Sequence, residues 1–404
     1  MISRAHKIKL KPNKAQAVML SKTAGTARYA YNWALARWKE LYDQGVRTSY
    51  VDLSREWTKD RPEWASEVTD GAPRRAIMNL DKAYKSFFKG VSKPPTFHKK
   101  GRKDSFYVGN IYAKLCGRHI KLPKVGSVRM RELLRYSDCK IMSYTVSHDA
   151  DDWYVSVQVE MEEEVRSSSS SFVGVDVGCK ALAIASDGTE CKTPGMLKDL
   201  ERQLKRKQRL LARKANGSKN RAKARIKVAK TYQRIRNIKQ DAVHKFTAAI
   251  AKNHGVVVME DLDVKSMQEN ADKRTRKGVH NSCMSEVHRQ LIYKCNSYIK
   301  VDRYYPSSKT CSSCGYHKAD LLLGDRTFVC PSCGLTIDRD LNAALNLLHE
   351  GIRIYTVGHT GSACGEVDGA SKKQEVFLRT YDRKEILLWR VRKRKLQLVV
   401  RRSN

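Results

Sequence analysis

The chain is poor in acidic residues and has no long apolar run. It carries 79 lysines and arginines against 42 aspartates and glutamates, a difference of 79 − 42 = +37. No segment approaches the roughly 20 apolar residues of a membrane-spanning helix, and residues 1–7 do not resemble a signal peptide. We therefore expect no membrane partner and a cytoplasmic location. The excess positive charge predicts nucleic acid as the partner, with a generic ribosomal-type binder as the plain alternative.

Cysteines in a disulfide pattern and internal repeats of 20–50 residues are also missing. Of the eleven cysteines, seven are scattered and odd in number, which is typical of reduced thiols in a cytosolic protein. The length of 404 residues and the 41% hydrophobic content indicate a folded chain of two or three domains.

Four cysteines in the spacing C-x2-C-x15-C-x2-C are the most specific motif in the chain. They are Cys311, Cys314, Cys330 and Cys333. Thiolates are tetrahedral zinc ligands, and Gly315 and Gly334 follow the two pairs at positions where a tight turn favours glycine. Because four thiolates complete the shell, we expect a structural zinc. His317 as a competing ligand and four unligated cysteines are the weaker alternatives.

The N-terminal part of the chain predicts strands and helices in two groups. Alternation of polar and apolar residues predicts a strand over 6–11 and short strands over 106–160, which together indicate a β-barrel-like module. Helical spacing predicts helices over 13–44, 51–60 and 71–90, and Asn13 with Gln16 resembles a capping box at the start of the first helix. A mostly acidic stretch, 160–164, and a serine-rich stretch, 167–171, follow these strands and are typical of a linker.

From residue 172 the pattern indicates an α/β domain and then a basic tail. We expect a strand over 172–178, then a strand over 182–186 that is followed by a hairpin turn at Asp187-Gly188. Further along, we expect two long helices, a strand, a helix, a strand and, after the cysteine motif, a final helix; their ranges are 198–245, 255–260, 283–299, 300–305 and 340–349. Residues 198–245 hold eighteen lysines and arginines against three acidic residues, which favours phosphate contact over a merely solvated face. Residues 353–404 are interpreted as a basic, mobile tail in which a short helix is an open alternative.

Three carboxylates are positioned for metal chemistry. Asp176 interrupts an apolar strand, Glu260 ends another and Asp340 begins the final helix. A strand aspartate is costly unless it binds a cation or forms hydrogen bonds, and two-metal phosphodiester hydrolysis needs acids from separate elements. Asp338 is the competitor of Asp340; helical phase with Ala344 favours Asp340, whereas Asp338 suits an ion pair or a backbone cap. The element order with acids at these positions is typical of an RNase H-like fold.

With these residues the chain resembles the TnpB family of transposon-encoded RNA-guided nucleases and the compact type V CRISPR effectors related to it. The matching segments are K-L-K-P-N-K-A-Q, A-R-Y-A-Y-N-W, G-V-D-V-G, V-M-E-D-L, S-S-K-T-C-S-S-C-G and D-R-D-L-N-A-A-L-N. The resemblance implies four parts, namely a wedge-type β-barrel, an inserted helical recognition lobe, a RuvC-like nuclease and a zinc-ribbon domain that binds target nucleic acid. Their bounds are 1–12 with 94–165, 13–93, 172–303 with 338–352, and 304–337.

The resemblance also implies an activity and its partners. It implies a monomer bound to one guide RNA copied from the transposon end, and a double-stranded DNA target recognised beside a short motif and cut on both strands. Asp176, Glu260 and Asp340 match the family's catalytic positions, which hold two Mg²⁺ ions that Mn²⁺ can replace. No HNH-type insert lies between residues 178 and 260.

Nucleic-acid contacts are predicted in two places. The motif-reading region of the family corresponds to Tyr50 and Arg74, whose guanidinium could read base edges in a bidentate manner. The basic loop over residues 94–103 predicts phosphate contacts from Lys99, Lys100 and Arg102.

Other functions remain open. A guided repressor or a nucleic-acid-binding accessory protein without cleavage would share most of these features, but the three acids are intact. A transposase is the weaker reading, because no His-hydrophobic-His motif with a tyrosine nucleophile is evident.

Overall fold

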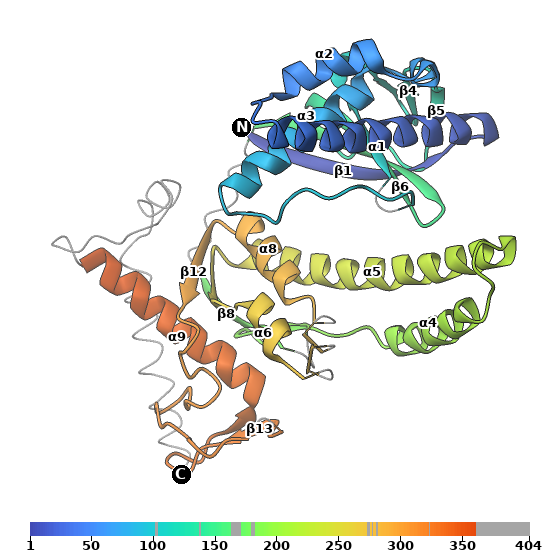
Figure 1. Cartoon of the computed structure of the whole chain (residues 1–404). Coiled ribbons are helices and arrows are strands. Elements are labelled where there is room, and N and C mark those ends of the chain that lie inside the picture. The colour runs from blue at the N-terminus through green and yellow to red at the C-terminus, as the bar shows by residue number, and fades with distance from the viewer. Residues whose placement is uncertain are drawn as a thin grey trace. The chain divides into compact units, whose positions relative to one another are not determined.

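The structure is a computed structural model shown in Figure 1. It describes residues 1–101, 104–136, 139–162, 171–178, 182–272, 275–276, 278–279, 282–322 and 324–360, with no side chains for 358–360. The described residues divide into two compact units, one within Met1–Glu164 and Leu210–Gln233, the other within Val165–Arg209 and Arg234–Asn404. None of the described helices is long and apolar enough to cross a membrane.

The first unit contains a seven-stranded antiparallel sheet with the order β2-β6-β7-β1-β5-β4-β3. Its strands are β1 (Ile2–Lys11), β2 (Ser105–Gly109), β3 (Lys114–Cys116), β4 (His119–Leu122), β5 (Gly126–Met130), β6 (Lys140–Asp149) and β7 (Asp152–Met161). The first strand pairs with β7 on one side and β5 on the other, so residues far apart in the sequence share one sheet. Because β2 and β3 do not pair in the described residues, the sheet has two edges. Its assignment as a wedge-type barrel therefore stays a prediction.

The helices of the first unit form their own small core and also cover the sheet. They are α1 (Lys14–Asp43), α2 (Tyr50–Asp60), α3 (Gly71–Phe88) and the short 3-10 helices Glu63–Glu67 and Asn110–Tyr112. The capping box predicted at the start of α1 is present, since Asn13 and Gln16 exchange side-chain and backbone hydrogen bonds. Trp57 of α2 is 1% exposed and packs edge-on against Trp33 of α1.

The second unit contains a five-stranded mixed sheet with the order β10-β9-β8-β11-β12. Its strands are β8 (Phe172–Asp176), β9 (Ala183–Ala185), β10 (Glu190–Cys191), β11 (Val256–Glu260) and β12 (Ser297–Val301). The three strands β8, β11 and β12 are parallel, and β9 runs antiparallel to both of its neighbours, β8 and β10. Gly188 has φ of 85° in the tight turn between β9 and β10, a conformation that favours glycine.

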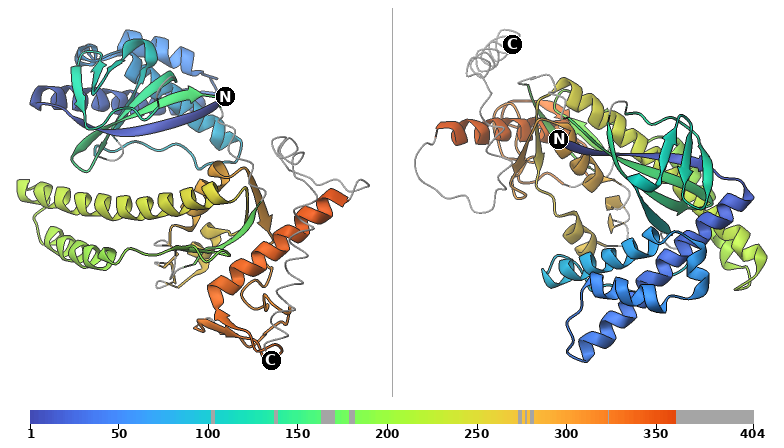
Figure 2. Two further views of the ribbon diagram at one scale, coloured as in Figure 1. Left: turned by 180° about the vertical axis from the view of Figure 1, so that it is seen from behind. Right: turned by 90° about the horizontal axis from the view of Figure 1, so that it is seen from above.

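Helices cover both faces of this sheet. The other elements of the second unit are most of α4 (Met196–Ala212), the C-terminal part of α5 (Lys219–Asn253), α6 (Val264–Asn270), α8 (Met284–Lys294), α9 (Arg339–Thr360) and the ribbon strands β13 (Thr327–Val329) and β14 (Thr336–Asp338). The end of α4 and the first part of α5, within Leu210–Gln233, belong to the first unit. Alternate residues of β8 and β11 pack against α5 and α8, while Val258 packs against Leu347 of α9 on the opposite face. The helices α4 and α5 lie side by side as a hairpin, which Figure 2 shows from two further directions.

Two predicted boundaries in the second unit are wrong. The helix expected over 283–299 ends at Lys294, and Ser297–Val301 forms a strand rather than residues 300–305. Pairing with β11 over its whole length decides this boundary, since that strand lies far away in the sequence.

The C-terminal predictions need one further correction. The final helix α9 continues to Thr360, into the predicted tail 353–404. The remainder of that tail, 361–404, and most of the serine-rich stretch lie outside the described residues.

Candidate functional site

The three candidate acids meet where the strands β8 and β11 of the five-stranded sheet have their carboxyl ends, which is called the acidic edge of the sheet below. Asp176 is the last residue of β8 and Glu260 the last residue of the parallel neighbour β11, and their strands are in register at Val175 and Met259 just before them. Asp340 is the second residue of α9, which packs on β8. The carboxyl ends of parallel strands in open sheets are the usual place for a site. The tertiary fold therefore brings together three residues spread over 164 positions of the sequence (340 − 176 = 164).

Burial and mutual repulsion perturb two of these carboxyls. Burial, followed by the negative charges of Asp340 and Glu260, raises the pKa of Asp176 to about 7, against an opposing effect of Arg339. Burial and then the charge of Asp302 raise the pKa of Glu260 to about 7. Carboxyls that repel one another in a buried setting gain free energy when a cation neutralises them.

The three acids differ in kind from the four cysteines, which are the one group among the described side chains whose three or more ligand atoms could hold a metal ion together. Two-metal sites hold their cations about 4 Å apart. Hard carboxylate oxygens from three separate elements fit a pair of divalent oxygen-seeking ions.

Glycine allows α9 to lie directly on the sheet. A Cβ added at Gly174 of β8 would stand 2.0 Å from the carbonyl oxygen of Ala344 and 2.6 Å from the backbone nitrogen of Leu348. Gly351 of α9 lies equally close to Val258 of β11, where a Cβ would meet side-chain carbons at 2.3–2.9 Å. These contacts fix the distance between the strand that carries Asp176 and the helix that begins beside Asp340.

Asp338 has a different task from Asp340. Its side chain is exposed and accepts hydrogen bonds from the backbone N–H groups of Asp340 at 2.9 Å and Leu341 at 3.2 Å. It therefore caps the first turn of α9, which is one of the roles that the sequence suggested for it.

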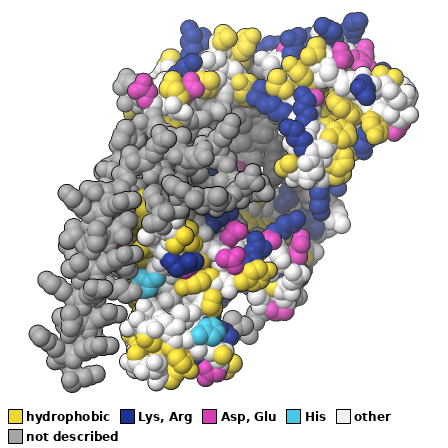
Figure 3. All heavy atoms as spheres, turned by 90° about the vertical axis from the view of Figure 1, so that its left-hand side faces the viewer, with side chains coloured by type: hydrophobic (Ala, Val, Ile, Leu, Met, Phe, Trp, Pro, Cys, Tyr) yellow, Lys and Arg dark blue, Asp and Glu magenta, His cyan; other side chains and the backbone are white. Residues whose placement is uncertain are grey.

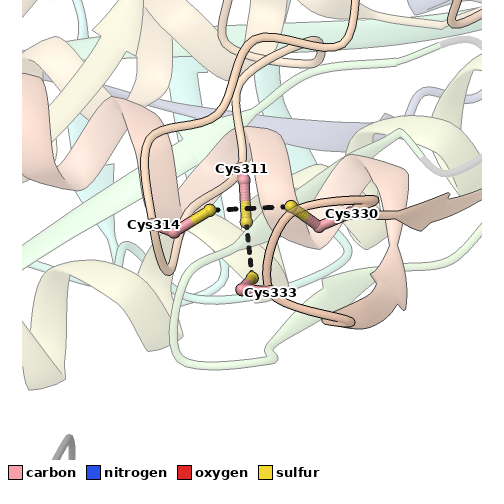
Figure 4. Close-up of side chains that lie close together, drawn as sticks. All are labelled: Cys311, Cys314, Cys330 and Cys333. Atoms are coloured by element: carbon pink, nitrogen blue, oxygen red, sulfur yellow. Dashed lines mark hydrogen bonds between the residues drawn. The ribbon is translucent and has the colours of Figure 1, made fainter.

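The four cysteines of the C-x2-C motifs form a compact cluster (Figure 4). Their sulfur atoms all lie within 4.8 Å, with Cys311 Sγ 3.7 Å from Cys333 Sγ and Cys314 Sγ 3.5 Å from Cys330 Sγ. Sulfurs about 2.3 Å from a tetrahedral zinc are about 3.8 Å apart, so the cluster could hold such an ion.

The local backbone supports these cysteines as ligands. Gly315 and Gly334 have φ of 81° and 75°, as the tight turns after each pair require. Burial opposes ionisation of Cys330, but hydrogen bonds from the backbone N–H groups of Cys333 and Ser332 lower the pKa of that thiol to about 7. A thiol with a pKa near 7 is readily available as a thiolate ligand.

Two buried asparagines of α9 form hydrogen bonds with the segment around the first cysteine pair. Both lie in the motif D-R-D-L-N-A-A-L-N, but the sequence alone indicated no role for them. Asn342 donates to the carbonyl oxygen of Thr310 at 2.7 Å and accepts from the N–H of Ser312 at 3.0 Å. Asn346 donates to the carbonyl oxygens of Ser307 at 2.7 Å and of Thr310. The first cysteine knuckle is thus fastened to the helix that begins at the candidate acid. The signal in the sequence that could have identified Asn342 and Asn346 is their spacing of one helical turn directly after Asp340.

The predicted nucleic-acid contacts lie in the first unit. Tyr50 and Arg74 line the same cavity of about 450 Å³ with Tyr107 and Tyr112, so the structure brings these two residues together. Its mixture of aromatic rings and guanidinium groups suits planar, electron-rich ligands.

The basic loop is tied to α1. Asn32 and the backbone of His98 exchange two hydrogen bonds of 2.8 and 3.0 Å, and the His98 ring stacks on Tyr31. Lys99 and Lys100 follow this anchor and are exposed, whereas Arg102 lies outside the described residues.

Family models match three stretches of the chain. A model described as "Probable transposase" covers residues 155–271, one described as "Cas12f1-like, TNB domain" covers 285–347, and one described as "Helix-turn-helix domain" covers 1–47. In the structure, the last of these stretches is strand β1 and the single long helix α1.

Curated relatives match over almost the whole chain. The chain is 31% identical over 399 residues to "Putative RNA-guided DNA endonuclease InsQ" of Escherichia coli (strain K12), covering 92% of this chain and 96% of that protein. It is 33% identical over 389 residues to "Putative RNA-guided DNA endonuclease" of Streptomyces pristinaespiralis, covering 93% of each.

A solved structure shares the fold. The protein of the Cas12f1-sgRNA-target DNA complex matches with a TM-score of 0.53 at 13% identity, covering 86% of this chain and 98% of that one. The fold and the site thus define an α/β protein of the Cas12f1 fold with an acidic sheet edge and a four-cysteine cluster. The full-length relatives place it further: the chain belongs to the TnpB family.

Proposed function

We propose that this protein is an RNA-guided, Mg²⁺-dependent DNA endonuclease that uses a guide RNA derived from a transposon end. It binds double-stranded DNA beside a short motif and cuts both strands at a single site. The observation that carries this proposal is the convergence of Asp176, Glu260 and Asp340 at one sheet edge, where burial and mutual repulsion favour bound cations. The names of the full-length relatives support the same activity.

The three acids would hold two Mg²⁺ ions, which Mn²⁺ can replace. When bound, such ions would supply an activated water and would neutralise the charge of the leaving oxygen. The chain itself orients the carboxylates, because each is attached to a different rigid element and the Gly174 contact sets the approach of α9. The strand order β10-β9-β8-β11-β12, in which β9 alone runs antiparallel to the other four strands, supports the RNase H-like assignment of residues 172–303 and 338–352.

Structural zinc is proposed for Cys311, Cys314, Cys330 and Cys333, in a ribbon over 304–337 that borders α9. The full set of four thiols leaves no open position for chemistry. Through Asn342 the ribbon would keep the beginning of α9 in place.

RNA and DNA would be held largely by their phosphates. The guide would choose the sequence through base pairing, while the protein contacts the backbone of the duplex. The basic helices α4 and α5 and the residues Lys99, Lys100 and Arg102 are proposed for this role, with Tyr50 and Arg74 as readers of the adjacent motif. Figure 3 shows lysine and arginine side chains spread over one face of the molecule, with acidic side chains among them.

The catalytic assignment is tested by neutral substitutions of nearly equal shape. The protein is purified with its co-purifying RNA and given a plasmid that carries the matching target, with Mg²⁺ or with EDTA. Asp176→Asn and Asp340→Asn should abolish cutting and leave RNA and target binding intact.

Asp338→Asn is the matched control, since asparagine caps helices as well as aspartate does and the side chain stands two residues from Asp340. It should cut at the wild-type rate. Cleavage by Asp176→Asn, or equal behaviour of the Asp338 and Asp340 variants, would overturn the assignment. A wild-type protein that binds the guided target and never cuts it would be a guided binding protein.

A further inference from the structure

Tyr304 presents its ring to solvent beside the acidic edge of the sheet. It is 84% exposed, more than any other aromatic side chain that the structure describes. A ring in water gains nothing for the fold, and a turn residue at such a position is commonly polar. The exposure of the ring therefore indicates a role in binding.

Its position in the chain places it next to Glu260. The strands β11 and β12 are parallel, and Glu260 pairs with Val301, the last residue of β12. Tyr304 follows Val301 by three residues. The ring thus belongs to the loop that leaves the sheet at the edge formed by the candidate catalytic acids.

Hydrogen bonds hold this loop in one shape. Asp302 accepts from the backbone N–H of Tyr304 at 2.8 Å through its carboxylate, and from that of Tyr305 at 3.1 Å through its carbonyl oxygen. The adjacent Tyr305 packs against the core between the sheet and α9. Two neighbouring tyrosines therefore have opposite orientations, one anchoring the loop and one facing outward.

Two cationic residues lie close to Tyr304 in the sequence. Lys300 and Arg303 pair with Asp261 at 3.0 and 3.5 Å, with side chains 57% and 44% exposed. An exposed aromatic ring with cations nearby is the combination by which proteins bind single-stranded nucleic acid, because every base has a face that can stack.

We propose that Tyr304 stacks on an unpaired base of the DNA strand that enters the acidic edge, and thereby positions the phosphodiester to be cut. This inference rests on the proposed nuclease function. Tyr304 is a positioning residue, since it touches a base and not the reacting phosphate. Removing one stacked base costs between about fivefold and 150-fold in binding.

Abasic substitution provides the test. Single-turnover cutting by the RNA-loaded protein is measured on targets in which one nucleotide at a time near the cut is made abasic. In the wild-type protein one abasic position should slow cutting by about fivefold or more, and Tyr304→Ala should slow cutting of the intact target by a similar factor. The two losses should not add, because both remove the same stack. Tyr304→Trp should restore the rate.

Tyr42→Ala is the control, because that ring is 66% exposed at the end of α1 in the other unit. It should cut at the wild-type rate. Wild-type cutting by Tyr304→Ala, or additive losses at every abasic position, would overturn the inference while leaving the nuclease assignment intact.

A second measurement does not depend on cutting. In EDTA, 2-aminopurine in the single strand of a partly unwound target should lose fluorescence on binding the wild-type protein. Equal quenching by Tyr304→Ala at every probe position would count against stacking. If the wild-type protein does not cut DNA at all, the proposed function fails, and this quenching still decides the role of the ring.

Discussion

Replacing Gly174 by alanine should separate the strand that carries Asp176 from the helix that carries Asp340. The added Cβ would stand 2.0 Å from the carbonyl oxygen of Ala344, whereas ordinary van der Waals contact begins near 3.4 Å. The overlap is 3.4 − 2.0 = 1.4 Å, and it is with backbone, which cannot rotate away as a flexible side chain can. Helix α9 must therefore move by about an ångström.

The size of the effect differs between stability and activity. Overpacking of this kind costs about 1–3 kcal/mol, which for a unit of about 200 residues lowers Tm by roughly 2–12 °C. A displacement of about 1 Å in a catalytic group costs about 100-fold in rate. The rate of DNA cutting should consequently fall by a large factor while the protein remains folded.

The assay compares plasmid cutting, Mg²⁺ dependence and thermal unfolding of Gly174→Ala with those of Gly195→Ala. At Gly195 a Cβ would meet no atom within 4 Å and φ is not positive, so this control should behave as wild type. The reasoning is refuted if Gly174→Ala cuts within about twofold of the wild-type rate at saturating Mg²⁺.

Three further perturbations follow from the site. The pKa values of Asp176 and Glu260 are raised from 3.8 and 4.5 to about 7, so their protonated forms stabilise the metal-free fold fully below about pH 4, and this contribution is lost as pH rises to 7. Because Mg²⁺ competes with these protons at pH 6 but not at pH 8, the increase in Tm caused by Mg²⁺ should be larger at pH 8, and equal increases would contradict this. Cys330→Ser should lose the bound zinc and lower Tm, whereas Cys116→Ser, at an exposed cysteine away from the cluster, should retain one zinc per chain in metal analysis. Asn346→Leu leaves the carbonyl oxygen of Ser307 without its side-chain donor, whereas Thr310 keeps Asn342, and the loss should cost about 1–3 kcal/mol in chemical denaturation. An unchanged midpoint would be the contrary result.

Sequence reasoning worked best where the determinant is local. The four-cysteine spacing predicted a compact cluster because two C-x2-C turns each place a pair of sulfurs close together, and the sulfurs do meet. The capping box at Asn13 and the turn at Gly188 followed from chemistry within four residues. The full-length relatives confirm the family resemblance carried by short motifs.

Long-range packing limited the remaining predictions. Nothing within 295–305 distinguishes the end of a helix from the start of a strand. The predicted boundary was wrong because pairing with β11, a distant part of the chain, determines the strand Ser297–Val301. The sequence also proposed two aspartates for the start of α9, and only the structure assigns the helix cap to Asp338.

By itself, then, the sequence determined the charge, the cysteine cluster, the order of elements and the identity of the three acids as candidates. Each of these depends on residue type or on spacing over a few residues. Only the tertiary structure decided how the acids meet, because their approach depends on Gly174 admitting the backbone of α9 and on Asn342 and Asn346 fastening the first knuckle to that helix. The role of Tyr304 likewise could not be predicted from the sequence, since the exposure of its ring beside a sheet edge is a property of the folded chain.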